Sequence, residues 1–203
     1  MSIADLDGDG KQEVISGASV IASNGKSFYA NGLGHGDALH VSDMDPTRKG
    51  LELWQCYEEP AKYGEYGMEF RDVQTGKPIW GVAGNGQDVG RCMAADIDPT
   101  HYGYEVWGSV GGLYDCKGNQ ISATRPRSMN FAVWWDGDLT RELLDGNHVD
   151  KWDYQNGQLV RLFTAEGCSS NNGTKATPAV SADLFGDWRE EVVLKKSDSS
   201  ALR

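Results

Sequence analysis

The chain has 203 residues, among them 26 glycines and 7 tryptophans, and a formal net charge of −11 at pH 7. This length allows one large all-β domain or two small ones, with a real core. The negative charge argues against nucleic acid or an anionic membrane surface as a partner. No apolar run approaches the length of a membrane span. The opening segment MSIADLDGDG lacks the basic and apolar parts of a secretion signal, so we expect no signal peptide in this chain.

The first predicted element is an acidic loop, ADLDGDGKQEV, which leads into a short β-type run at residues 13–15. Alternating carboxylates, two glycines in a tight turn, a backbone carbonyl near Lys11 and a closing acid form the pattern of a calcium loop. No amphipathic helix follows, so the loop is not an EF-hand. An ion-free acidic turn is the alternative, but carboxylates this close repel one another without a cation. The predicted calcium ligands are Asp5, Asp7, Asp9, Lys11 and Glu13.

The acidic loop recurs four times along the chain, at intervals of roughly 40 to 50 residues that are typical of propeller blades or solenoid coils. In the last copy Phe185 stands where Asp7 stands in the first, so this copy is the one expected to have lost its ion. The calcium ligands predicted in the four copies are Asp43, Asp45, Glu52, Asp96, Asp98, Glu105, Asp136, Asp138, Glu142, Asp183, Asp187 and Glu191.

Each unit is predicted to continue with short strands and a β-hairpin. Short apolar runs follow the loops at residues 13–15, 52–54 and 105–107, and glycine-containing turns end near Gly25, Gly76, Gly118 and Gly157. Only RELLDG, residues 141–146, hints at a helical turn. About four strands per unit favour a β-propeller over a solenoid. Tryptophans such as Trp54, Trp80 and Trp107 are then expected between the blades, with sugar stacking as the less favoured alternative.

The predicted fold class is all-β: a single partial β-propeller domain over residues 1–203, with repeats beginning near residues 5, 43, 96, 136 and 183. The fifth repeat is predicted to lack a hairpin, because SDSSALR stops where its next strand would begin. A propeller closes its ring to remove sheet edges, and about four blades plus a half do not close. We therefore expect a fragment of a larger propeller, completed by missing blades or by a second copy of the chain.

The four cysteines, Cys56, Cys92, Cys116 and Cys168, contain no CxxC pair, which disfavours a structural zinc site. Buried free thiols are the favoured interpretation. A disulfide such as Cys92 to Cys116 stays open, because sequence alone does not fix pairing.

Chemistry is expected in the segments that the repeat does not require. In NGLGHGDALHVSD, residues 31–43, His35 and Asp37 would face the same side of an extended strand. Such a pair can ligate an ion or hold a sugar hydroxyl, and a hydrogen-bonded histidine in a glycine-rich loop is an equal alternative.

Two further segments stand out for the same reason. In residues 84–98, Arg91 suits bidentate binding of a carboxylate, or it could bridge the neighbouring acidic loop. In residues 167–179 a polar loop carries one basic residue, Lys175, and is either a binding loop or a solvated connection.

Six strings occur together and in order: GHGDALHVSDMDPTRKGLE, DVGRCMAADIDP, WWDGDLTRELLD, KWDYQNGQLV, SNNGTKATPA and ADLFGDWREEV. With them the chain resembles, over essentially its whole length, the rhamnogalacturonan lyases of polysaccharide lyase family 11. The resemblance implies a calcium-dependent enzyme with an eight-bladed propeller, of which this chain would be a part. It also implies an extracellular or periplasmic location and a pectic polysaccharide, rhamnogalacturonan I, as substrate, without nucleic acid or membrane partners.

The implied reaction is β-elimination between rhamnose and galacturonate, which leaves an unsaturated uronate. Such a lyase needs a cation or guanidinium on the uronate carboxylate, a base near C5 and a proton source for the departing O4. By motif, Arg91 and Lys175 match family active-site residues, and Asn172, Gly173 and Thr174 match a sugar-binding loop.

The role of each residue follows as a hypothesis from this match. Arg91 and calcium neutralise the uronate, and Lys175 acts as base or charge stabiliser. His35 is the second candidate base, although a calcium-ligand role with Asp37 is preferred. The competing hypothesis is a non-catalytic, calcium-stabilised propeller module that binds carbohydrate or protein.

Overall fold

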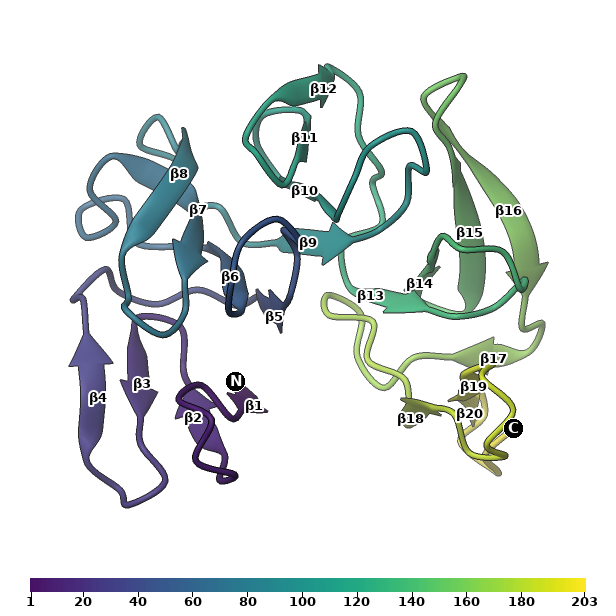
Figure 1. Cartoon of the computed structure of the whole chain (residues 1–203). Helices are drawn as coiled ribbons and strands as arrows, with labels where there is room; N and C mark the ends of the chain where they lie inside the picture. The colour runs from purple at the N-terminus through teal and green to yellow at the C-terminus, as the bar shows by residue number, and fades with distance from the viewer. The chain divides into compact units, whose positions relative to one another are not determined.

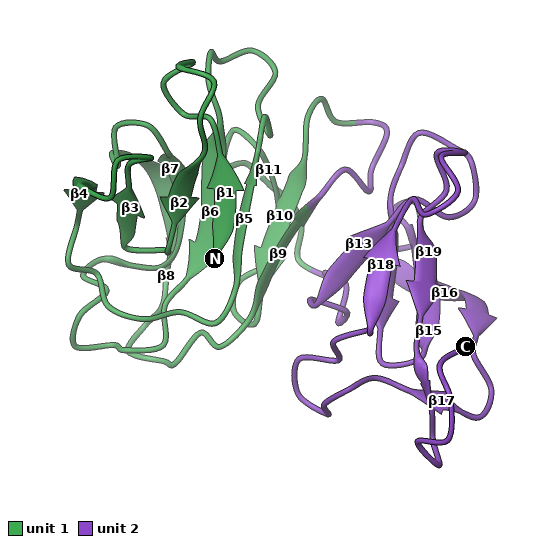
Figure 2. Ribbon diagram, turned by 90° about the horizontal axis from the view of Figure 1, so that it is seen from below, with its two compact units in different colours: residues 1–94, 101–123 green, residues 95–100, 124–203 purple.

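The computed structural model describes residues 1–203 and contains twenty β-strands joined by loops and turns (Figure 1). The predicted all-β class is confirmed. No helix in the structure has the length and apolar character needed to cross a membrane. The chain divides into two compact units: unit 1 comprises residues 1–94 and 101–123, and unit 2 comprises residues 95–100 and 124–203 (Figure 2).

Sixteen strands form four antiparallel sheets, and within each sheet the strands lie side by side in chain order. Short connections favour this arrangement, because a tight turn joins only antiparallel neighbours. The first sheet contains β1 (Ser2–Ala4), β2 (Glu13–Ile15), β3 (Ser19–Ile21) and β4 (Ser27–Ala30). The second contains β5 (Leu39–Ser42), β6 (Glu52–Cys56), β7 (Tyr66–Asp72) and β8 (Pro78–Ala83). The third contains β9 (Cys92–Ala95), β10 (Glu105–Gly108), β11 (Leu113–Asp115) and β12 (Gln120–Ser122). The fourth contains β13 (Phe131–Val133), β14 (Glu142–Asp145), β15 (His148–Asp153) and β16 (Gln158–Thr164).

Each acidic loop connects the first strand of a sheet to the second, and its closing glutamate is the first residue of that second strand. The glutamate carboxylate also fastens the loop by accepting a backbone N–H from it. Four such bonds are observed: Leu6 N to Glu13 at 2.9 Å, Met44 N to Glu52 at 3.0 Å, Trp135 N to Glu142 at 2.9 Å and Leu184 N to Glu191 at 2.7 Å. The acid therefore has a structural role in each of these loops, whatever else it binds.

The glycine turns connect the third strand of each sheet to the fourth, as predicted. Each glycine has a positive φ that other residues rarely adopt: +79° at Gly25, +71° at Gly76, +88° at Gly118 and +64° at Gly157. The Gly25 and Gly118 N–H groups donate to Ala22 O and Asp115 O at 2.8 and 3.0 Å, which closes the turns.

The second sheet is covered on both faces within unit 1. On one side Leu53 and Val73 pack with Ile15 and Val20 of the first sheet. On the other side its apolar residues form one cluster with residues of the third sheet. Strand β6 is accordingly buried at all five positions.

The tryptophans of unit 1 lie in this core, as predicted. Trp54 is fully buried and donates its indole N–H to Trp107 O at 3.1 Å. Trp80 stacks on Phe70, with ring centroids 5.4 Å apart. All four cysteines are buried and carry free thiols.

The fifth repeat differs from its prediction. Strands β18 (Val180–Ala182) and β19 (Glu191–Val193) pair with each other, and β17 (Cys168–Ser169) pairs with β20 (Lys195–Lys196). The prediction that this repeat lacks a hairpin was wrong. The chain reverses after β20, and Leu194 and Arg203 exchange backbone hydrogen bonds at 2.9 and 2.8 Å. Asp198 supports this reversal by accepting the Ser200 N–H at 3.0 Å.

The prediction of a helical turn at RELLDG, residues 141–146, was also wrong, because residues 142–145 form the strand β14 (Glu142–Asp145). Leu144 of this strand packs with Val133 and Val149 in the core of unit 2, and Val192 of β19 packs against the same cluster. Pairing with strands on both sides outweighs the helical propensity of leucine and glutamate.

Candidate functional site

The segment around His35 lies in unit 1 and connects the first sheet to the second. It is a loop rather than an extended strand, but His35 and Asp37 meet as expected, with His35 Nε2 3.1 Å from Asp37 Oδ1. Glu58, just beyond the end of β6, completes the group, since its Oε2 lies 3.4 Å from the same imidazole nitrogen. One ligand atom from each of the three residues falls within 4.8 Å of the others. This mixture of imidazole and carboxylate donors could hold a divalent cation.

Arg91 adjoins this group from the segment that precedes β9. Its guanidinium Nη1 donates to Asp37 O at 3.3 Å, and its carbonyl accepts the Ser109 N–H at 2.9 Å. The bond to Asp37 O brings the guanidinium to the backbone of the loop that carries His35 and Asp37. The alternative that Arg91 bridges the neighbouring acidic loop stays open beside this contact.

A groove of about 490 Å³ opens beside the His35–Asp37 loop. It is lined by Met1, Ser16, Gly17, Gly34, His35, Gly36, Asp37, Leu39 and Gln55. The Gln55 side chain is buried, and its amide oxygen has no hydrogen-bond partner. The groove therefore has a mixed polar and apolar lining, with an unused acceptor in its wall.

Gly36 holds the His35–Asp37 loop against the second sheet. A Cβ at this position would lie 1.8 Å from the Cys56 carbonyl oxygen, which belongs to a paired strand and cannot move freely. Gly36→Ala is expected to destabilise unit 1 by about 1–3 kcal/mol and to separate His35 from Glu58. Urea unfolding and the chemical shifts of the His35 ring measure the two effects.

Gly173 provides the matched control, because its Cβ position is open and its φ is not positive. Gly173→Ala should leave the unfolding curve unchanged. Equal stability of both variants would contradict the assigned role of Gly36.

His40, at the second position of β5, is a half-buried imidazole near Arg91. Its Nε2 lies 3.1 Å from Cys92 O, and burial, with a smaller effect from the Arg91 guanidinium, lowers the pKa of His40 from 6.5 to about 4. Between these values the unfolded chain binds a proton that the folded chain does not, so stability falls as pH drops from about 6.5 to about 4.

We expect this linkage to remove up to roughly 3 kcal/mol of stability. The His40→Asn variant keeps an N–H donor for Cys92 O but does not titrate in this range. Urea unfolding of both proteins across the range should show the steeper loss in the wild type. Parallel pH dependences would exclude His40 as the source.

Lys175 lies in unit 2, in the polar loop that precedes β18. Asn172 shapes this loop: its Oδ1 accepts the Lys175 N–H at 2.9 Å, and its Nδ2 donates to Thr177 Oγ1 at 3.0 Å. Gly173 and Thr174 are exposed, and Lys175 is half-buried. The loop thus has a defined conformation and presents its polar tip to solvent.

The acidic loops differ in how well they fit calcium. In the first loop one oxygen from each of Asp5, Asp7 and Glu13 lies within 4.8 Å of the others, which suits a hard cation. Asp9 lies outside this group and pairs with Lys11, whose ammonium is 3.1 Å away.

The third and fifth loops give contrasting results. Burial, together with the carboxylates of Asp98 and Asp138, raises the pKa of Asp96 to about 6, and a cation would relieve this repulsion. In the fifth loop the Asp183 carboxylate accepts backbone N–H groups from Gly186, Asp187 and Trp188 at 2.6 to 3.2 Å. Phe185 there is 79% exposed and offers no ligand atom from its side chain.

The second and fourth loops already contain a lysine ammonium. Lys117 Nζ lies 2.6 and 2.7 Å from the two Asp45 carboxylate oxygens. Lys151 Nζ lies 3.0 Å from Asp136 and 2.8 Å from Asp138. The sequence pattern predicted calcium at both loops and gave no indication of these lysines.

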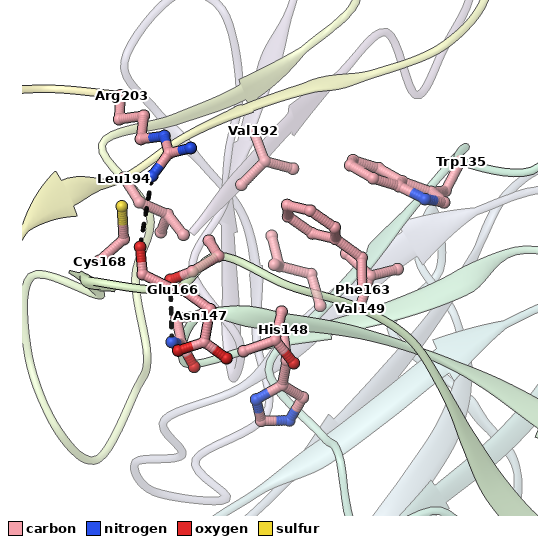
Figure 3. Close-up of a pocket in the computed structure, with 13 residues that line it drawn as sticks. Trp135, Asn147, His148, Val149, Phe163, Glu166, Cys168, Val192, Leu194 and Arg203 are labelled. Carbon is pink, nitrogen blue, oxygen red and sulfur yellow. Dashed lines mark hydrogen bonds between the residues drawn. The ribbon is translucent and has the colours of Figure 1, made fainter.

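A separate cavity of about 350 Å³ lies within unit 2 (Figure 3). One side is apolar, where Trp135 stacks on Phe163 with centroids 5.4 Å apart. The opposite side carries Asn147, Glu166 and Arg203, and the Arg203 guanidinium donates to Glu166 O at 3.3 Å. None of the residues predicted for catalysis lines this cavity.

The sequence places His35 and Asp37 in one segment and Arg91 in another, and the structure brings the two segments together. Sequence reasoning missed Glu58. The available indication was the pair Glu58–Glu59 directly after a buried strand, where side chains project from the end of the second sheet.

The fold and its loops define an all-β repeat protein built from four-stranded antiparallel sheets, each with an acidic loop between its first two strands. The chain belongs to rhamnogalacturonan lyase family 11: the model described as "Rhamnogalacturonan lyase family 11, C-terminal domain" matches residues 1–203.

Similar proteins agree with this membership. The rhamnogalacturonan endolyase YesW of Bacillus subtilis is 58% identical over 203 residues, which are 100% of this chain and 32% of that protein. The rhamnogalacturonan exolyase YesX of the same organism is 51% identical over 219 aligned residues, covering 100% of this chain and 35% of that protein. A solved rhamnogalacturonan lyase of Bacillus licheniformis superposes with a TM-score of 0.94 at 58% identity, over 100% of this chain and 34% of that one. The chain thus spans about a third of the length of the relatives it matches.

Proposed function

We propose that this chain is part of a rhamnogalacturonan lyase that cleaves the bond between rhamnose and galacturonate by β-elimination. The observation that carries the proposal is the hydrogen bond from Arg91 to Asp37 O, because Asp37 belongs to the His35–Asp37–Glu58 group and also lines the groove. A guanidinium next to cation ligands is what an anionic sugar requires. The names of the relatives indicate the polymer, and the site suits its chemistry.

The elimination is difficult because the proton at C5 is only weakly acidic and its removal adds negative charge beside a carboxylate. We assign Arg91 to neutralise that carboxylate, since its planar fork can bind two oxygens at once. Lys175 serves as the base or stabilises the developing charge, and Asn172, Gly173 and Thr174 bind sugar hydroxyls. His35 is assigned to cation binding with Asp37 and Glu58 rather than to proton transfer.

The chain's own charge makes local cations necessary. At a net charge of −11 it repels an anionic polysaccharide at long range, so binding depends on short-range positive groups. Arg91 and Lys175 provide two of them. A calcium ion held by His35, Asp37 and Glu58 would supply further positive charge to a uronate carboxylate. Calcium at Asp5, Asp7 and Glu13 would instead stabilise the loop between β1 and β2.

The four sheets support a propeller architecture, because each is a four-stranded antiparallel meander with the same loop at the same place. Since the chain spans about a third of its relatives, we propose that a longer lyase supplies the further blades of the ring. A polymeric substrate such as pectin does not cross membranes, so we place the enzyme outside the cytoplasm, either secreted or periplasmic.

The test is to incubate the chain, alone and within a longer lyase that contains it, with calcium and rhamnogalacturonan and to follow the ultraviolet absorbance of unsaturated uronate. Product is expected from the longer lyase. Carboxyl-reduced rhamnogalacturonan is the control and should give none, because elimination needs the C6 carboxyl function to acidify C5. Polymer retained in an affinity gel without any product would instead indicate a binding module and would overturn the proposal.

A further inference from the structure

The acidic loop of the fourth repeat, residues 136–142, receives a cation from its own sheet. One oxygen from each of Asp136, Asp138 and Glu142 lies within 4.8 Å of the others. The Lys151 ammonium donates to Asp136 Oδ2 at 3.0 Å and to Asp138 Oδ2 at 2.8 Å, and it also bonds Glu142 Oε1. Three carboxylates therefore converge on a single nitrogen, which uses all three donors of the ammonium.

The pairing of strands fixes this arrangement. Strand β14 pairs with β15 so that Leu143 opposes Asp150, and the same register places Lys151 opposite the closing glutamate, Glu142. The Glu142 side chain is 0% exposed and that of Lys151 is 19% exposed.

The position opposite the closing glutamate differs between the sheets. By the observed registers it is Ala22 opposite Glu13, Asp72 opposite Glu52, Asp115 opposite Glu105 and Lys151 opposite Glu142. Only the fourth sheet has a cationic residue there. The first sheet, with a small neutral residue, leaves its three carboxylates to converge without an ammonium from the third strand.

The second loop reaches a related result by another route. Lys117, in the turn between β11 and β12, extends to the loop between β5 and β6 and contacts both Asp45 oxygens at 2.6 and 2.7 Å as well as Thr47 Oγ1. The side chain of Asp45 is 3% exposed. A lysine is thus the observed counter-ion in two of the acidic loops of this chain.

We propose that Lys151 is the resident cation of the 136–142 loop and excludes calcium from it. Calcium binds carboxylate oxygens at about 2.3–2.6 Å and would need the oxygens that the ammonium holds. Both cations cannot occupy one small carboxylate group, because they repel each other and there are too few oxygens. The lysine is covalently attached and competes at any calcium concentration. This inference concerns which loops bind calcium, and it stands apart from the proposed lyase activity.

The experiment first removes metal from the protein with a chelator, then saturates it with calcium and counts the calcium ions bound per chain. Lys151→Ala reproduces the situation of Ala22 in the first sheet and is expected to bind one more calcium ion per chain than the wild type. Adding Asp136→Asn to Lys151→Ala should abolish the extra ion. Lys26→Ala, in the exposed turn between β3 and β4, controls for loss of a lysine and should leave the count unchanged.

The proposal is overturned if Lys151→Ala gains no ion, because the lysine would then not be what excludes calcium. Asp136→Asn in the wild-type background gives a second test that does not need the Lys151 variant to fold. If it removes one calcium ion, the loop binds calcium in spite of Lys151 and the proposal is wrong. An unchanged count supports it. A calcium count is independent of product formation, so its failure is distinguishable from failure of the lyase assignment.

Discussion

Replacing Arg71 by methionine is expected to lower the free energy of unfolding of unit 1 by about 3–5 kcal/mol. Arg71 is fully buried on β7, and its Nε donates to Glu69 Oε1 at 2.7 Å. Glu69 is itself only 3% exposed. Removal of the guanidinium would leave a buried carboxylate without its counter-charge, which destabilises a protein more than replacing both charged partners by apolar residues.

The same guanidinium joins the first sheet to the second. Its Nη1 donates to Gly17 O at 3.2 Å, in the connection between β2 and β3, and its Nη2 donates to the Tyr57 hydroxyl. Methionine fills much of the volume of the arginine stem but makes none of these bonds. The effect should therefore include a looser contact between the two sheets, seen as faster hydrogen exchange at Gly17 and Tyr57.

The measurement is urea unfolding followed by tryptophan fluorescence. The Glu69→Leu/Arg71→Met double variant should recover most of the lost stability, because a well-packed apolar pair often replaces a buried ion pair without cost. Lys196→Met is the exposed counterpart: its ammonium lies 3.5 Å from Asp198 in solvent and should contribute less than about 1 kcal/mol. If Arg71→Met lowers the free energy of unfolding no more than Lys196→Met does, the buried ion pair does not have the stabilising role assigned to it.

The local features of this chain could be predicted from its sequence. Acidic loops, glycine turns and short strands depend on chemistry within a few residues, such as the positive φ of Gly118 or the bond from Met44 N to the Glu52 carboxylate. The SDSS turn could have been predicted too, since Asp198 caps it by a common side-chain bond.

Burial of Glu69 and Arg71 could not be predicted in this way. In β7, Met68 and Phe70 alternate with these charged residues, which normally indicates a strand with one face in water. The second sheet instead packs on both sides, so both faces of β7 are buried. Alternation reports the two faces of a strand correctly but does not say what covers each of them.

In the candidate site, too, the sequence predicts the residue types but not the contacts between them. The chemistry of His35, Asp37 and Arg91 was visible in separate segments, but their contact depends on how the second and third sheets pack. Glu58 joins its cluster from the end of a strand and Lys151 joins its cluster through strand register, and the local sequence does not say which residues either one meets. The sequence therefore predicts which residue types are present, and tertiary packing determines whether a carboxylate cluster lies next to an arginine or a lysine side chain.

Replacing Arg91 by alanine, in a lyase that contains this chain, is expected to lower kcat/KM on rhamnogalacturonan by about 10²–10³-fold. If Arg91 neutralises the uronate carboxylate, its loss exposes the growing charge of the transition state. Arg91→Lys should recover only part of the rate, because lysine keeps the charge but not the two-pronged geometry. Initial rates of unsaturated uronate formation measure the effect, and Lys26→Ala should retain wild-type activity.

Arg91 also donates to Asp37 O at 3.3 Å, so the loss could arise from a displaced His35–Asp37 loop instead. A methyl-esterified polymer separates the two causes, because its uronates carry no charge to neutralise. With charge neutralisation as the cause, Arg91→Ala should be impaired far less on the ester than on the free acid. A displaced loop would impair both substrates equally. The ratio of the two penalties therefore assigns Arg91 either to the substrate carboxylate or to the support of the loop that carries His35.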